Sequence, residues 1–408
     1  MESGKQWVML VAGSKGWNDY RHQANVCHAY HMMHQNGIPD DQIVVMMYDD
    51  IAYNDKNPYR GNIINKPNGP NVYPGVPKDY TGKDVTPENF LAALKGNRHA
   101  VKKRNPKVIT SGRKDTIFIY MTDHGAPSLF CFPNNSSLYA SDLIETIKEM
   151  ARDRKFSKMV IYMESCYSGS MFTQLPNNIH VYAVTSTKPG DKGYACYKDT
   201  KRQTYLSDEF SAVWMHYSEK ENLDKVTFQD QFDYLQNKMQ KSCPCQFGDM
   251  TIGKRPISEF LKNTPQTIRQ TIKAQMLVLT DLTSNHEVTF KILMLQIRTE
   301  TDAGRRQVLI RKYEALDKAR DKIEGTIETI NRHFFPEVVV EDGLVGYYRS
   351  SRDLFAFKTV AEHFRTTRFN WHEEEFLITL SYMHVFARLC ASGIGAKRII
   401  DVITAASG

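Results

Sequence analysis

The first 210 or so residues alternate between short apolar runs and segments whose apolar residues recur at helical spacing. The apolar runs cover residues 6–12, 42–48, 116–121, 159–163 and 180–185, and the helical spacing covers residues 24–34, 87–94 and 141–152. The runs are continuously apolar, which is typical of strands covered on both faces. Such strands separated by helices predict an α/β fold, with a mostly parallel sheet and helices on both of its faces.

The pattern changes near residue 285. Residues 288–330, 353–363 and 373–389 have helical periodicity, and the first of these segments is rich in Leu, Ile, Arg, Lys and Glu with almost no turn residues. A chain of 408 residues has room for two domains. We therefore expect an α/β domain over residues 1–260, a linker over residues 261–286 and an all-α region over residues 287–408.

Composition and charge exclude several classes of protein. Lys and Arg outnumber Asp and Glu by 53 to 46, and this excess is spread along the chain, so no nucleic-acid partner is expected. No apolar run reaches the roughly 18 residues of a membrane span. The first residues, MESGKQW, lack the basic-then-apolar order of a signal peptide. The seven cysteines are too few and too scattered for a disulfide scaffold.

Polar side chains follow two of the predicted strands. His124 and Gly125 come just after the run at 116–121, and Cys166 comes just after the run at 159–163. Ligand sites in parallel sheets lie at this edge, where an imidazole can take the proton of a thiol. The backbone N–H groups of Gly125 and Cys166 could bind an oxyanion. A buried structural cysteine and a core histidine form the alternative, and the residues alone leave the two interpretations about evenly matched.

Longer stretches carry a resemblance to a known family. The segments VAGSKGWNDYRHQANVCHAYHMMHQNGIPDDQIVVMMYDD, TDHGAP, ESCYSGSMF and YACY occur in this order. They resemble the legumain family of asparaginyl endopeptidases, which are caspase-like cysteine proteases. The resemblance runs from about residue 6 to 260 and continues more weakly to HFRTTRFNWH, which resembles the family's prodomain. It implies a caspase-like α/β protease domain followed by an all-α, death-domain-like prodomain.

The resemblance implies a role for each residue that matches the family's motifs. Cys166 would be the nucleophile and His124 the base. Asp19 would orient the base, and Gly125 would supply an oxyanion donor. The pocket for the residue before the scissile bond would be lined by Arg21, His22, Glu164, Tyr194 and Asp208. An asparagine amide is both a donor and an acceptor, so a guanidinium and carboxylates can satisfy its two ends.

The implied reaction is hydrolysis of peptide bonds after Asn, and after Asp at acidic pH, by an enzyme made as an autoinhibited zymogen. No cofactor and no metal would be required. The expected partners are protein and peptide substrates, the prodomain as an inhibitor, and cystatin-type inhibitors. The expected location is lysosomal, endolysosomal or secreted. The candidate positions for activating cleavage are Asn263, Asp281 and Asn285, and overlapping glycosylation sequons lie at Asn134 and Asn135.

Departures from the family pattern keep other functions open. The family usually has Asn at the position of Asp19, commonly Glu at Tyr167, and a pair of serines at Lys192-Gly193. A catalytically impaired relative that acts by binding is one alternative, and a peptide asparaginyl ligase is another. The protease-like subunit of the GPI-anchor transamidase shares the His and Cys motifs but predicts a C-terminal membrane span. Charged residues interrupt residues 380–408, so no span is expected there.

Acidic pH is expected to release the prodomain. Glu164 and Asp208 are expected on the face of the protease domain that meets it. The opposing basic residues would be Arg305, Arg306, Arg311 and Lys312. Protonation of the two carboxylates would then weaken the pairing.

Overall fold

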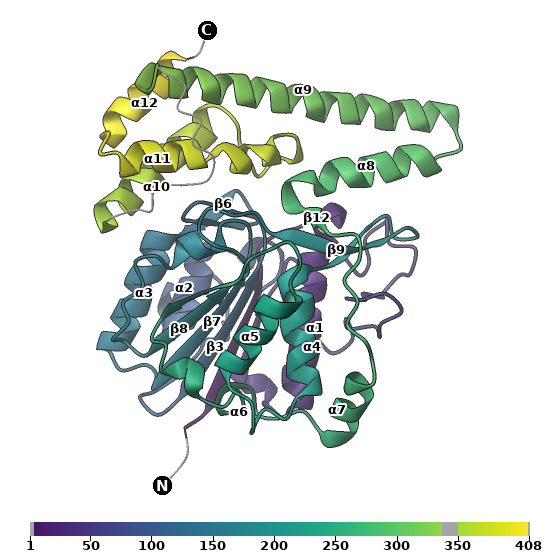
Figure 1. Ribbon diagram of the computed structural model, residues 1–408, viewed down its shortest axis with the longest axis vertical. Coiled ribbons are helices and arrows are strands. Elements are labelled where there is room, and N and C mark those ends of the chain that lie inside the picture. Colours follow the sequence, from purple (N-terminus) through teal and green to yellow (C-terminus); the bar gives the residue numbers. More distant parts are fainter. Residues whose placement is uncertain (1–3, 337–349, 407–408) are drawn as a thin grey trace.

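The structure is a computed structural model that describes residues 4–336 and 350–406. An α/β domain carries the N-terminus, and a helical region formed by the C-terminal part of the chain lies over one edge of its central sheet (Figure 1). The α/β domain positions the residues at its strand ends, and the helical region covers them.

The central sheet has six strands in the order β11-β8-β7-β3-β1-β2. Their bounds are Gln6–Ala12 for β1, Ile43–Met46 for β2, Thr116–Thr122 for β3, Lys158–Glu164 for β7, Val181–Thr185 for β8 and Cys245–Gly248 for β11. Neighbouring strands pair in parallel, except that β11 pairs with β8 in antiparallel orientation. The predicted α/β fold with a mostly parallel sheet is confirmed.

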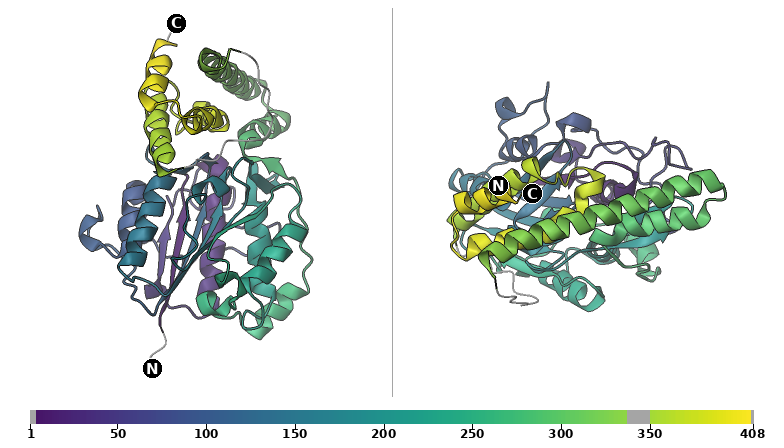
Figure 2. Two further views of the ribbon diagram at one scale, coloured as in Figure 1. Left: turned by 60° about the vertical axis from the view of Figure 1, so that its left-hand side comes forward. Right: turned by 90° about the horizontal axis from the view of Figure 1, so that it is seen from above.

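Helices cover both faces of the sheet, as its continuously apolar strands predict (Figure 2). In β1, Trp7, Met9 and Val11 lie in the core on one face, whereas Val8, Leu10 and Ala12 lie in the core on the other. Within the α/β domain, the helices of the first core are α2 (Pro87–Lys95) and α3 (Ala140–Arg152), and buried residues of the C-terminal helices join the same core. Those of the second are α1 (Tyr20–Gln35), α4 (Glu209–Lys220) and α5 (Phe228–Lys238).

Two small sheets lie beside the carboxyl ends of the central strands. One contains β4 (Gly125–Ala126), β5 (Leu129–Phe132) and β6 (Ser136–Tyr139). The other has the order β10-β9-β12, where β9 is Tyr194–Asp199 and β10 is Thr204–Asp208. The third strand, β12 (Thr283–Ser284), comes from the predicted linker and follows the short helices α6 (Ser258–Leu261) and α7 (Gln266–Lys273).

The C-terminal region is helical, as predicted, but two of its expected segments are divided. Residues 288–330 form two helices, α8 (Val288–Thr299) and α9 (Ala303–Phe334). The second begins after Asp302, whose side chain accepts the Arg305 N–H and so caps α9. Residues 373–389 form a 3-10 segment, Glu374–Tyr382, followed by α11 (His384–Ala391). The remaining helices are α10 (Ser351–Thr367) and α12 (Ala396–Ala405).

The helical region contacts the α/β domain through a shared hydrophobic core and through polar groups. Tyr139 donates to a carboxylate oxygen of Glu362 over 2.6 Å, and Lys358 pairs with Asp142 over 2.7 Å. Asn18 donates to Glu374 over 2.9 Å. The helical region therefore presents carboxylates as well as cations to the protease domain.

The expected ion pairs between the two regions are not found among the described residues. Glu164 and Asp208 are buried inside the α/β domain. Arg305 and Lys312 pair with Glu300 and Glu374, which belong to the helical region itself. The prediction that Glu164 and Asp208 bind the basic C-terminal residues is therefore wrong. No helix within residues 4–336 and 350–406 is long and apolar enough to cross a membrane.

Candidate active site

His124 and Asp19 form a hydrogen-bonded pair at the edge of the sheet. His124 follows β3, and Asp19 is the last residue of a 3-10 turn that leads into α1. The Nε2 atom of His124 lies 2.7 Å from Oδ1 of Asp19. Burial opposes ionisation of both groups, but their mutual attraction prevails, so the pKa of His124 is raised and the pKa of Asp19 is lowered. Asp19 thus does what an orienting residue must do for an imidazole.

Cys166 lies directly beyond the end of β7 and is 1% exposed. Its Sγ accepts the Gly193 N–H over 3.2 Å. Burial raises the pKa of this thiol to about 11, although the N–H of Gly193 and the amide of Asn285 partly offset the rise. Cys166 is therefore a thiol at neutral pH in the intact chain.

Gly125 brings the histidine segment against the cysteine segment. A Cβ atom on Gly125 would lie 2.5 Å from the carbonyl oxygen of Cys166, so only glycine allows this approach. The Cys131 N–H donates to the His124 carbonyl, and antiparallel ladders alternate between bonded and non-bonded pairs. The next pair, Gly125 with Phe130, is then the non-bonded one, which leaves the Gly125 N–H directed away from the ladder.

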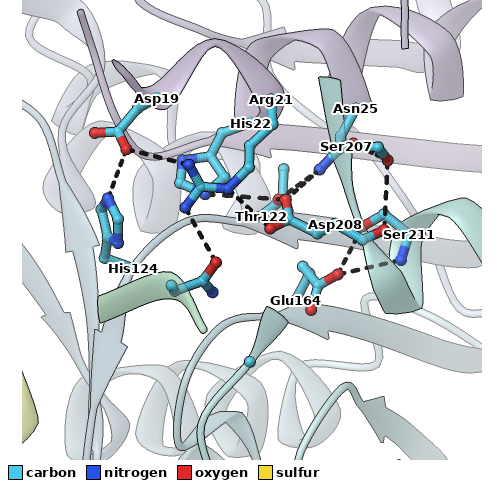
Figure 3. Close-up of polar contacts among 12 residues, drawn as sticks. Asp19, Arg21, His22, Asn25, Thr122, His124, Glu164, Ser207, Asp208 and Ser211 are labelled. Atoms are coloured by element: carbon cyan, nitrogen blue, oxygen red, sulfur yellow. Dashed lines mark hydrogen bonds and ion pairs between the residues drawn. The ribbon is translucent and has the colours of Figure 1, made fainter. Parts of the chain in front are cut away.

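Arg21 and Asp208 form a buried ion pair beside these groups (Figure 3). Arg21 Nε lies 2.9 Å from Asp208 Oδ1, and neither side chain is exposed. Burial opposes the charge on Arg21, but Asp208 and Asp19 raise its pKa. Burial raises the pKa of Asp208, although Arg21 and Asn25 oppose the rise. The pair is therefore the charged part of the pocket that the resemblance implies.

Glu164 lies next to Asp208 at the end of β7. One of its carboxyl oxygens accepts the Ser211 N–H over 3.1 Å. Burial and the neighbouring Asp208 raise the pKa of Glu164 well above its usual range. Asp208 has the Arg21 guanidinium as a direct partner, whereas Glu164 is held by Ser211, so the proximity of the two carboxyl groups favours a proton on Glu164.

His22 and Tyr194 are the other two residues that the resemblance implies for the pocket. His22 is fully buried, and its Nδ1 lies 2.6 Å from Ser14 Oγ. Burial, Arg21 and His124 lower the pKa of His22 well below its usual value, so its ring is neutral. Tyr194 belongs to β9 and pairs with Ser284 of the linker strand.

Among the described residues, the cluster that could hold a metal is Asp19, His22 and His124. Their donor atoms lie within 4.8 Å of one another. Asp19 and His124 already bond to each other, and the Arg21 guanidinium lies 3.6 Å from Asp19. A cation there would break the hydrogen bond between Asp19 and His124, and it would be repelled by the positive charge of Arg21.

Asn285 occupies the pocket. Strand β12 pairs with β9 in antiparallel orientation, and the Asn285 N–H donates to the Gly193 carbonyl over 3.0 Å. The Asn285 side chain accepts from Arg21 over 3.1 Å, and its Nδ2 lies 3.7 Å from Cys166 Sγ. A Cβ atom on Gly193 would lie 3.0 Å from this Nδ2, so glycine at this position leaves room for the side chain.

The other proposed cleavage and glycosylation positions lie elsewhere. Asn263 bonds to Asn222 and to the Leu223 N–H, and Asp281 lies in the linker with a positive φ of 56°. Asn134 and Asn135 form the turn between β5 and β6 and are exposed. Their side chains are engaged, Asn134 with the Gly82 carbonyl and Asn135 with Asn370 of the helical region.

Several residues of the site were not predicted from the sequence. Asn25 donates to Asp208 over 2.8 Å, and Ser207 donates to Asn25 over 3.0 Å. Asn25 follows Arg21 by four residues on α1, and this i,i+4 spacing, which places both on one face of the helix, is the signal that could have identified it. Ser211, which bonds Glu164, offers no such signal because its partner is distant in the sequence.

Comparisons with known proteins identify the family of this chain. A model of the peptidase C13 family matches residues 6–277. Legumain of Rattus norvegicus is 42% identical over 401 residues, which cover 98% of this chain and 91% of that protein. Legumain of Homo sapiens is 41% identical over 399 residues, covering 98% and 92% respectively. A crystal structure of caspase-1 from Spodoptera frugiperda aligns at a TM-score of 0.35 and 9% identity, covering 60% of this chain and 86% of that one, which is too distant to support a conclusion. The chain belongs to the peptidase C13 family and is a cysteine endopeptidase.

Proposed function

We propose that this chain is the autoinhibited zymogen of an endopeptidase that cleaves after asparagine, and after aspartate at acidic pH. The observation that supports it is the placement of Asn285, whose side chain bonds Arg21 and lies beside the Cys166 sulfur. Its backbone extends β9 as a strand, which is how extended peptides bind to sheet edges. A protonated aspartic acid has the same donor and acceptor as asparagine, which extends the proposal to Asp at acidic pH.

The proposed chemistry uses the groups around Asn285. Cys166 Sγ attacks the carbonyl carbon of the residue in the pocket, and the Gly125 and Cys166 N–H groups stabilise the oxyanion. His124, oriented by Asp19, takes the thiol proton and passes it to the leaving amine. Water then hydrolyses the thioester. If an amine attacks instead, the same thioester gives ligation, so this chemistry allows ligase activity as well.

The Asp19–His124 pair favours a working enzyme over a relative that acts only by binding. A carboxylate at position 19 holds the imidazole at 2.7 Å and raises its pKa, which keeps it able to donate a proton to the leaving amine. We also propose a lysosomal, endolysosomal or secreted location, with cystatin-type inhibitors among the partners. These proposals rest on the family alone.

Turnover of peptides by the intact and the acid-treated chain tests the proposed function. We expect little cleavage by the intact chain, because Asn285 and the helical region cover Cys166, and strong cleavage after Asn once acid has released them. Replacing Asn285 with alanine should prevent cleavage at this position while free peptides containing Asn remain substrates. Full activity of the intact chain at neutral pH, or equal cleavage after Ala and Asn, would contradict the proposal.

Activation should be faster at lower pH because three partly buried histidines lie where the helical region meets the site. Burial lowers the pKa of His286 to about 3 and the pKa of His372 to about 4, and it also lowers the pKa of His384. Lys192 faces both His286 and His384 and adds to the effect. When the helical region is released, these imidazoles regain a pKa near 6.5. As the pH falls, the released state therefore binds protons before the docked state does, and release becomes more favourable.

The docked state therefore loses stability from about pH 6.5 downward, by roughly tenfold per pH unit for each histidine. The measurement is the rate at which a fragment beginning at His286 appears between about pH 4 and pH 7.5. His286→Phe should weaken this pH dependence, whereas His99→Phe, at an exposed position, should not. A cleavage rate that does not depend on pH would show that these histidines do not control release.

A further inference from the structure

A chain of buried hydrogen bonds runs from the pocket to a distant part of the α/β domain. It starts at Asp208, whose Oδ2 accepts from Asn25 Nδ2 over 2.8 Å. Asn25 Oδ1 accepts in turn from Asn65 Nδ2 over 2.9 Å. Asn65 also donates to the Leu206 carbonyl over 2.8 Å, and both asparagines are buried. These bonds fix which end of each amide faces Asp208 (Figure 3 shows the Asn25 end).

The chain ends at a histidine–carboxylate pair outside the pocket. His28 Nδ1 lies 2.8 Å from Asn65 Oδ1, and His28 Nε2 lies 2.6 Å from Glu219 Oε1. The two side chains are 17% and 11% exposed and line a cavity of about 630 Å³ between α1, α4 and the linker. His28 can therefore exchange protons with solvent, whereas Asn25, Asn65 and Asp208 are buried.

The bond directions require a charged His28. Asn65 must use its oxygen toward His28, because its nitrogen already donates to Asn25 and to the Leu206 carbonyl. Glu219 is a carboxylate and also accepts. Both ring nitrogens of His28 therefore face acceptors, and only the imidazolium carries a proton on each. Loss of one proton breaks one of the two bonds.

We propose that Asn25 and Asn65 are positioning residues that hold Asp208, and through it Arg21, in place for the substrate side chain, and that the charge on His28 determines how firmly they hold. This inference rests on the proposed function, because it concerns the pocket for asparagine. Asp208 and Arg21 contact each other directly, so a shift of the carboxylate moves the guanidinium that Asn285 uses.

The charged groups around His28 set the direction of its pH response. Burial opposes the charge, but Glu219 of α4 and Asn65 raise the pKa of His28 above its ordinary 6.5. Lys66, in the loop that follows β2, opposes this rise in the pKa of His28. His216 of α4 and His31 of α1 also face His28 and Glu219. All the hydrogen bonds that position Asp208 are then formed at acidic pH. One of the His28 bonds is lost as the pH rises through the raised pKa of His28.

His28→Gln, measured on the acid-activated enzyme, tests the proposal. At about pH 5 we expect KM for a peptide with Asn before the scissile bond to rise about three- to tenfold, with kcat nearly unchanged. The ratio of mutant to wild-type KM should fall toward one as the pH rises, because the wild type loses the same proton. Glu219→Gln should move this change to lower pH, because Glu219 raises the pKa of His28.

His34→Gln is the matched control, because His34 pairs with Asp40 on the same helix but both are about half exposed. It should leave KM unchanged at every pH. A KM ratio for His28→Gln that is constant with pH, an effect confined to kcat, or an equal effect of His34→Gln would overturn the proposal.

A second measurement does not depend on activity. In the intact chain carrying Cys166→Ala, the carboxyl ¹³C signal of Asp208, assigned by its loss in Asp208→Asn, should shift as His28 titrates. It should not shift in this way when His28→Gln is added. Absence of cleavage after Asn in the activated wild type would contradict the proposed function alone. An Asp208 carboxyl signal that does not shift as His28 titrates would overturn the hydrogen-bond coupling.

Discussion

Replacing Cys166 with alanine is expected to abolish cleavage of Asn-containing peptides while the chain still folds. Cys166 Sγ is the proposed nucleophile, and it contacts both the Gly193 N–H and the Asn285 side chain. Losing a protease nucleophile lowers kcat by about 10⁴–10⁶-fold. Within the described part of the chain, the thiol accepts the Gly193 N–H and a longer contact from Asn285, so its removal should cost the folded state little. The measurements are kcat/KM on an Asn peptide and the thermal midpoint of unfolding.

Cys27→Ala is the control for loss of a buried thiol. Cys27 is fully buried on α1 and lies 3.7 Å from the sulfur of Met47, on the helix side of the core. It should cost stability and leave kcat/KM close to that of the wild type. Equal loss of activity in Cys27→Ala with the fold intact, or substantial activity in Cys166→Ala, would show that the nucleophile has been wrongly assigned.

The parts of this molecule that local pattern determines could be predicted from the sequence. The continuously apolar segments at residues 6–12 and 116–121 predict buried parallel strands, and the structure contains β1 and β3 there. Because parallel strands end at one edge, the same pattern predicts that His124 and Cys166 lie near each other. The contact of Gly125 with the Cys166 carbonyl confirms this placement.

The parts that depend on distant partners could not be predicted in this way. Asn285 was one of three candidate cleavage positions, and only the pairing of β12 with β9 distinguishes it from Asn263 and Asp281. Glu164 and Asp208 were expected both in the pocket and on the face that meets the helical region, and their burial inside the α/β domain contradicts the second expectation. Carboxylates look alike in a sequence whether they bind a prodomain or a buried arginine.

Asp19 gives the catalytic pair a charge that the family's usual asparagine would lack. Asparagine at this position would orient His124 without charge. The carboxylate instead raises the pKa of His124 and is balanced by Arg21 at 3.6 Å. Arg21 therefore serves two carboxylates, Asp19 at the catalytic pair and Asp208 in the pocket, and couples the catalytic pair to the pocket.

Replacing Arg21 with methionine is expected to remove selectivity for asparagine. Arg21 is fully buried and bonds both Asp208 and the Asn285 side-chain oxygen. Without the guanidinium, Asp208 is left as a buried charge with no cation, which costs about 3–5 kcal/mol of stability. For an Asn peptide, kcat/KM should fall by about 10²–10³-fold or more, since a truncated buried charge pair costs about 2–5 kcal/mol. The measurement is kcat/KM for matched peptides with Asn or Ala in the pocket.

Arg202→Met separates the loss of selectivity from the loss of a buried ion pair. Arg202 is 8% exposed and pairs with Asp199 over 3.1 Å between β9 and β10. It bonds neither Asn285 nor Asp208 among the described residues, so its replacement should lower the free energy of unfolding but keep the preference for Asn over Ala. If both variants lost selectivity equally, general loosening of the fold would explain the effect. If Arg21→Met kept its preference for Asn, the guanidinium would not be the group that recognises the asparagine amide.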